Sequence, residues 1–134
     1  MHITLPQLNC VRFIANRLSE QGQRVLDITG VWGSAKTLAA VQTAEALGAP
    51  LLLLTAGRIE AESMFDDLTA FAGPDRALLL PSWEVLPSDA MDPSDDIVAE
   101  RMNTLQQLSA AFEDAPMVAA VPLRSMLQYV TPRE

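Results

Sequence analysis

The stretch "VLDITGVWGSAKTLAAVQTAEALG" (residues 25–48) decides the fold of this chain. It begins with a short apolar and partly β-branched run, residues 25–29, which is typical of a buried strand. A loop with two glycines follows, and then comes an apolar helical pattern that ends at Gly48. A strand, a glycine-containing loop and a helix in this order indicate a phosphate-binding loop.

The loop "GVWGSAKT" (residues 30–37) is a degenerate Walker A motif. Gly30, Lys36 and Thr37 fit the pattern, whereas Ala35 stands where the pattern has its second glycine. This single position decides whether the loop still binds a nucleotide.

A working loop of this kind turns backbone N–H groups toward a phosphate at a helix amino terminus, and adds a lysine charge and a magnesium-binding hydroxyl. The residues expected to supply these groups are Gly30, Gly33, Ser34, Lys36 and Thr37. The methyl of Ala35 and the indole of Trp32 oppose tight binding, although alanine is unstrained where the backbone is already helical. Two interpretations stay open: weak binding of ATP and magnesium, or a loop that only connects strand and helix and requires no cofactor.

Strands and helices continue to alternate along the rest of the chain. Further strands are expected at 50–55, 77–80 and 117–121, and further helices from Pro6 to Gly22 and at 58–72, 94–112 and 123–130. The apolar positions that we expect to face inward are Ile59, Phe65, Leu68 and Phe71 in one helix, and Ile97, Val98, Met102, Leu105 and Leu108 in another.

Strands that are buried on both faces and alternate with helices require right-handed crossovers and a parallel sheet. The pattern therefore predicts a three-layer α/β/α domain of the P-loop NTPase type. A ligand site in such a domain lies at the carboxyl ends of the strands, where residues 29–37 and 81–96 both fall.

The segment "PSWEVLPSDAMDPSDD" (residues 81–96) is a long loop with three prolines and five acidic residues. Trp83, Glu84 and Leu86 are the residues that we expect to contact neighbouring domains. For Trp83, an ordinary role as an anchor in the core is an equally open interpretation.

Catalytic residues cannot be assigned. Nucleotide hydrolysis requires acids that hold magnesium and orient water, normally at a strand end. Asp27 lies inside its expected strand, and Glu84 follows a turn. His2 is the only histidine, so neither a catalytic triad nor a metal cluster is expected.

Composition limits the classes of partner. The chain has 134 residues and 49% hydrophobic content, which suits one domain with a core of its own. Its 17 acidic and nine basic residues give a net charge of −8, so DNA binding by this domain alone is not expected. The mean hydropathy of +0.17 is high for an acidic domain and suggests that a neighbour covers part of its apolar surface.

The sequence also favours the cytoplasm. No apolar stretch reaches the length of a membrane span, and no signal peptide pattern begins the chain. Cys10 is the only cysteine, so it cannot form an internal disulfide, and its place in a helical pattern predicts a buried, unreactive thiol.

The block Trp83-Glu84-Val85-Leu86-Pro87, with Pro93, Asp96-Ile97, Glu100-Arg101 and Thr104-Leu105 after it, carries a resemblance to a known family. Together with residues 27–71 and the run "VAAVPLRSMLQYV" (residues 118–130), it resembles the amino-terminal segment of the bacterial transcription-repair coupling factors, the Mfd family. The resemblance extends from about Leu5 to Pro132.

This resemblance implies a fold and a role. The segment is similar to domain 1a of the excision-repair protein UvrB, and in coupling factors its phosphate loop is degenerate and the ATP-driven motor lies elsewhere. The chain is then a fragment of a multidomain protein that acts on stalled RNA polymerase and recruits UvrA. The expected function is a non-catalytic structural domain. The alternatives are a domain that still binds ATP, favoured by the retained Lys36 and Thr37, or part of a UvrB-type ATPase.

Overall fold

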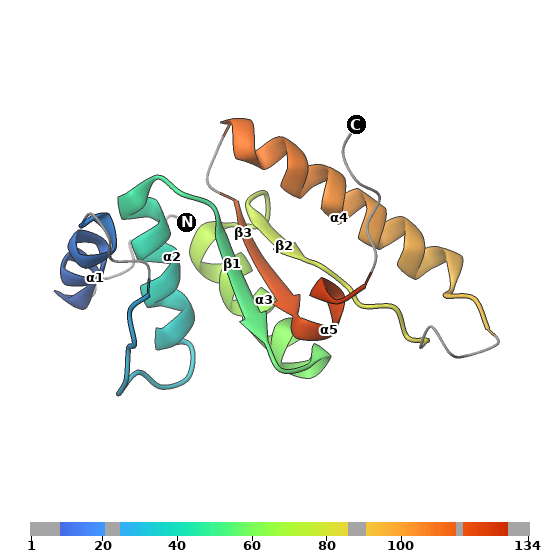
Figure 1. Ribbon diagram of the computed structural model, residues 1–134, viewed down its shortest axis with the longest axis horizontal. Coiled ribbons are helices and arrows are strands. Elements are labelled where there is room, and N and C mark those ends of the chain that lie inside the picture. Colours follow the sequence, from blue (N-terminus) through green and yellow to red (C-terminus); the bar gives the residue numbers. More distant parts are fainter. Residues whose placement is uncertain (1–8, 21–24, 86–90, 115–116, 129–134) are drawn as a thin grey trace.

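The computed structural model describes residues 9–20, 25–85, 91–114 and 117–128. The elements in chain order are α1 (Asn9–Ser19), α2 (Ala35–Leu47), β1 (Leu51–Thr55), α3 (Arg58–Ala72), β2 (Ala77–Leu79), α4 (Asp95–Asp114), β3 (Val118–Pro122) and α5 (Leu123–Met126). Figure 1 shows a small sheet with α4 on one side and the pair α1 and α2 beyond the edge formed by β1. None of the described helices combines the length and the apolar character of a membrane span.

The sheet is parallel, and its strand order is β1-β3-β2. β3 is the central strand. It is buried along its whole length because it has a strand on each side and helices on both faces. α3 packs on one face with Val41 of α2, where Ala61 and Leu68 are fully buried. Leu105 and Leu108 of α4 pack on the opposite face. The predicted parallel α/β arrangement is therefore present, with three strands among the described residues.

The prediction of a strand at residues 25–29 is wrong. These residues have no regular structure and lie outside the sheet, and 80% of Val25 and 48% of Ile28 are exposed. They do not pair with β1, which is an edge strand among the described residues, so a strand-like composition alone does not place a segment in a sheet.

Two predicted helix ends are confirmed. α2 ends at Gly48, whose left-handed φ of 62° turns the chain so that the N–H of Ala49 donates to the carbonyl of Ala44 at 3.1 Å. α3 ends at Gly73, whose φ is 92°. Both glycines hold backbone angles that other residues rarely adopt.

The inward faces of α3 and α4 differ from the prediction at three positions. Ile59 is 84% exposed because it lies on the side of α3 that faces away from Ala61 and Leu68. In α4, Val98 and Met102 are exposed. The polar residues Arg101 and Thr104 of α4 are buried instead, as described below.

α1 also corrects one prediction. Val11, Ile14 and Ala15 are buried, but Cys10 is exposed, contrary to the prediction of a buried thiol. Its helical position places it on the outer side together with Phe13, over whose ring the guanidinium of Arg17 lies at 5.5 Å. Pro6 and Gly22, the predicted limits of this helix, lie outside the described residues.

Candidate functional site

The loop before α2 contains two glycines with unusual backbone angles. Gly30 and Gly33 have φ angles of 79° and 54°, both in the left-handed region. Added Cβ atoms at these two positions would have no neighbour within 4 Å, so only the backbone angle requires glycine there. Figure 1 shows this loop at the end of the molecule to which the strands point.

Two of the loop's amide groups already donate hydrogen bonds inside the loop. The N–H of Ala35 donates to the carbonyl of Trp32 at 3.3 Å, and the N–H of Lys36 donates to the carbonyl of Gly33 at 3.2 Å. Ala35 is the first residue of α2, so its backbone is helical and unstrained. A phosphate would have to replace these two internal bonds to use both amides.

The Thr37 side chain is also engaged. Its hydroxyl donates to a carboxylate oxygen of Asp67 in α3 at 3.3 Å, and only 1% of Thr37 is exposed. Magnesium coordination by this hydroxyl would require that bond to open or Asp67 to join the coordination. Lys36 is exposed, and Ser34 makes no side-chain bond to the start of α2.

Trp32 lies on the outside of the loop and is 85% exposed. The sequence led us to expect that the indole would oppose phosphate binding by its place in the loop. In the structure the indole lies outside and does not fill the place of a phosphate. Together with the exposed Val25 and Ile28, it gives this end of the domain an apolar surface.

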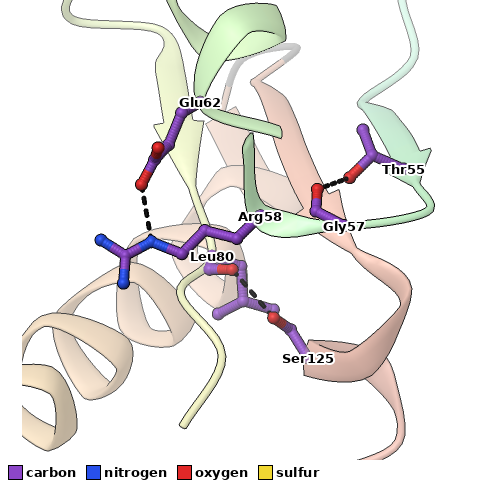
Figure 2. Close-up of polar contacts among 6 residues, drawn as sticks. All are labelled: Thr55, Gly57, Arg58, Glu62, Leu80 and Ser125. Atoms are coloured by element: carbon purple, nitrogen blue, oxygen red, sulfur yellow. Dashed lines mark hydrogen bonds and ion pairs between the residues drawn. The ribbon is translucent and has the colours of Figure 1, made fainter. Parts of the chain in front are cut away.

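A second candidate site lies where β2 ends and residues 81–85 begin. Three consecutive carbonyl groups at this strand end each accept a hydrogen bond from a buried polar side chain. The pairs are Thr104 Oγ1 with Leu79 O at 3.2 Å, Ser125 Oγ with Leu80 O at 3.1 Å, and Arg101 Nη1 with Pro81 O at 2.8 Å. The second pair is drawn in Figure 2.

Arg101 is the centre of this arrangement. It is 2% exposed, and its other terminal nitrogen donates to the carbonyl of Ser125 at 2.9 Å. The guanidinium also lies over the indole of Trp83 at 5.6 Å. Burial lowers the pKa of Arg101. The side chain thus joins α4, α5 and the segment after β2.

The predicted interaction residues take part in this framework. The backbone N–H of Trp83 donates to the Gln128 side chain at 2.9 Å, and the indole N–H is buried without a partner among the described residues. A carboxylate oxygen of Glu84 accepts the N–H of Ser94 at 3.0 Å. Leu86 lies outside the described residues. Trp83 therefore acts as an anchor within the domain, and the structure leaves its role between domains untested.

The pKa values of two charged side chains in this region, Glu84 and Arg58, are shifted. Hydrogen bonds from its own backbone N–H and from Ser94 hold the pKa of Glu84 below its ordinary value. Arg58 pairs with Glu62 at 2.6 Å (Figure 2), and this hydrogen bond and the nearby negative charge raise the pKa of Arg58. A cavity of about 130 Å³ lies beside this pair and is lined in part by Glu100 and Ser82.

We also searched the loop before α2, the end of β2 and the other described residues for groups that could bind a metal ion. The part of the chain that the structure describes contains no group of three or more histidine, cysteine or acidic side chains that could hold a metal ion. Sequence reasoning missed Asp67 and Ser125, because nothing in their local pattern marks them. Arg101 and Thr104 were visible only as part of the quoted block.

Comparisons with known proteins identify relatives. No family profile and no solved structure matches the chain. The transcription-repair-coupling factor of Mycobacterium tuberculosis is 37% identical over an alignment of 98 residues that covers 69% of this chain and 8% of that protein. That of Escherichia coli is 32% identical over 111 residues, 82% of this chain and 9% of that protein. That of Bacillus subtilis is 28% identical over 121 residues, 90% of this chain and 10% of that protein. The chain is a homologue of the transcription-repair-coupling factors, and the matched segment spans 8–10% of their length.

Proposed function

We propose that this chain is a non-catalytic structural and interaction domain of a transcription-repair coupling factor. It would form the first part of a UvrB-like module in transcription-coupled excision repair, while the ATP-driven motor lies elsewhere in the longer protein. Other domains of the same protein are its direct partners, and UvrA and RNA polymerase are reached through the full-length protein.

One observation carries this proposal: two amides and the hydroxyl that would bind a nucleotide are already bonded within the domain. The N–H groups of Ala35 and Lys36 bond to loop carbonyls, and the Thr37 hydroxyl bonds to Asp67. A ligand has to break these bonds before it gains its own, which lowers its net affinity.

Calorimetric titration of the chain with Mg-ATP tests the proposal. We expect no binding tighter than about 0.1 mM, equivalent to about 5.5 kcal/mol. The Lys36→Ala variant should give the same titration as the unchanged chain. Tighter binding that disappears in Lys36→Ala would support the alternative, a domain that retains ATP binding.

Substitutions at two positions, Lys36 and Arg101, distinguish a scaffold from a catalyst in the longer protein. In a strand-specific repair assay, we expect Lys36→Ala to leave transcription-coupled repair unchanged. Arg101→Leu should reduce repair, because it removes the side chain that joins α4 and α5 to the segment after β2. Loss of repair in Lys36→Ala at normal protein levels would instead favour an ATPase role.

A further inference from the structure

α5 adds no apolar side chain to the core of the domain. Leu123, Met126 and Leu127 follow one another at helical spacing, and they are 50%, 52% and 79% exposed. Neither core cluster of the described residues contains any of these three side chains. The buried residue of this helix is the polar Ser125. Hydrogen bonds, and not apolar burial in the core, therefore decide where α5 lies.

The side-chain amide of Gln128 holds the segment after β2. Its oxygen accepts the backbone N–H of Trp83 at 2.9 Å, and its nitrogen donates to the Trp83 carbonyl at 3.4 Å. Neighbouring strands of a sheet bond through the same two kinds of backbone group, so this side chain acts in place of a strand. The position of the Trp83 backbone is thus tied to that of Gln128, which lies 45 residues later in the sequence.

Two further side chains of α5 bond to the same segment. Ser125 Oγ donates to Leu80 O at 3.1 Å, and Figure 2 shows this hydroxyl directed at the carbonyl where β2 has ended. Arg124 Nη2 donates to Val85 O at 3.0 Å. Arg101 of α4 donates to a carbonyl on each side of the junction, as described above. The junction between α5 and the segment after β2 is therefore a set of side-chain hydrogen bonds to backbone groups.

The sheet is held by other bonds. The N–H of Val118 in β3 donates to the carbonyl of Arg76 at 3.0 Å. Thr104 Oγ1 of α4 bonds to Leu79 O, which belongs to β2 itself. An element that buries little apolar surface opens at a lower free energy than the core of its domain. The junction at α5 can therefore open without the sheet.

We propose that residues 81–85 and 123–128 form a latch, whose two segments separate in a single step while the sheet stays folded. The step is single because the three side chains that bond the first segment all leave with α5. A displacement of the chain that follows Gln128 then releases the backbone at Trp83. This conformational device goes beyond the proposed function, since it does not depend on whether the loop before α2 binds a nucleotide.

Amide hydrogen exchange of the 134-residue chain tests the proposal. The amide of Trp83 reports on one segment of the latch, and the amide of Leu127, which donates to Arg124 O at 3.2 Å, reports on the other. The amide of Val118 reports on the sheet. We expect the protection factors of Trp83 and Leu127 to agree within about threefold and to be at least about tenfold lower than that of Val118.

Ser125→Ala and Thr104→Val are matched variants, since each removes one hydroxyl that donates to a carbonyl at the end of β2. Ser125→Ala should speed exchange at both Trp83 and Leu127 about fivefold, the equivalent of one hydrogen bond of about 1 kcal/mol. Thr104→Val should speed exchange at Val118 by a similar factor and leave Trp83 and Leu127 unchanged. The reason is that its bond lies in the sheet and persists when the latch opens.

Gln128→Ala is a second variant, at a partly buried position near the end of the described chain, so it should fold. It should speed exchange at Leu127 about fivefold, although the Leu127 amide bonds within its own helix. Exchange at Trp83 as slow as at Val118 would overturn the proposal, because the latch would then open only with the whole domain. A response of Leu127 without Trp83 in Ser125→Ala would also overturn it, because the two segments would then open separately. Neither result bears on the ATP titration, so the proposed function is judged separately.

Discussion

The hydroxyl of Thr37 donates to the carboxylate of Asp67 at 3.3 Å, and this bond ties the first turn of α2 to α3. In a phosphate loop the same hydroxyl would be free to hold magnesium. Here it stabilises the contact between two helices that cover one face of the sheet. The motif thus keeps its residue types while its hydroxyl has a structural partner.

Replacing Thr37 with valine should lower the free energy of unfolding by about 1 kcal/mol, the usual net value of one hydrogen bond. Valine keeps the shape of the buried side chain, so the loss reflects the bond and not a cavity. Urea unfolding measures the change. Thr29→Val is the control, because Thr29 is exposed and should change stability little. Equal stability of Thr37→Val and the unchanged chain would show that the bond contributes nothing.

Replacing Arg101 with leucine should destabilise the domain by about 3 kcal/mol. The carbonyls of Pro81 and Ser125 then lose their donor in a buried place, and an unsatisfied buried group costs about 1–3 kcal/mol. Arg101→Lys should recover only part of the loss, since an ammonium lacks the planar fork that spans both carbonyls. Urea unfolding again gives the values.

Arg12→Leu serves as the control for Arg101→Leu, because Arg12 is exposed on α1. It should change the free energy of unfolding by less than about 0.5 kcal/mol. A similar small effect of Arg101→Leu would mean that residues 81–85 and α5 keep their positions without the guanidinium.

The Glu84 carboxylate should make stability depend on pH in the acid range. Its pKa in the folded domain is below the ordinary value of 4.5 because hydrogen bonds from backbone groups and Ser94 stabilise the charged form. The contribution is therefore complete above pH 4.5 and is lost as the pH falls through the lower folded-state pKa. Glu84→Gln should make the unfolding midpoint less dependent on pH in that window.

Asp66→Asn is a suitable comparison for Glu84→Gln, because Asp66 is also an exposed acid and lies on α3. A carboxyl titration followed by NMR measures the Glu84 pKa directly. A value at or above 4.5 would contradict the role given to Ser94.

Sequence patterns correctly predicted features that depend on local signals, such as helix ends. They failed where contacts with residues distant in the sequence determine the structure. Gly48 and Gly73 end their helices as expected, because a left-handed residue stops a helix wherever it stands. Residues 25–29 have a strand composition but lie outside the sheet, because composition does not specify whether a segment pairs with another strand. Arg101 was missed as a buried residue because helical periodicity counts apolar side chains. Its burial depends on hydrogen bonds to the carbonyls of Pro81 and Ser125, which lie 20 and 24 residues away in the sequence.

Cys10 should react rapidly with a maleimide or with an aromatic disulfide while the domain is folded. The reason is its exposed position on α1, on the side opposite the buried Val11 and Ile14. We expect one thiol to be labelled, at a rate within about tenfold of that in urea, as for a group that needs no opening of the fold. Cys10→Ser should remove all labelling. A rate that rises several hundredfold on unfolding would show instead that the thiol is covered, as the helical pattern of the sequence first suggested.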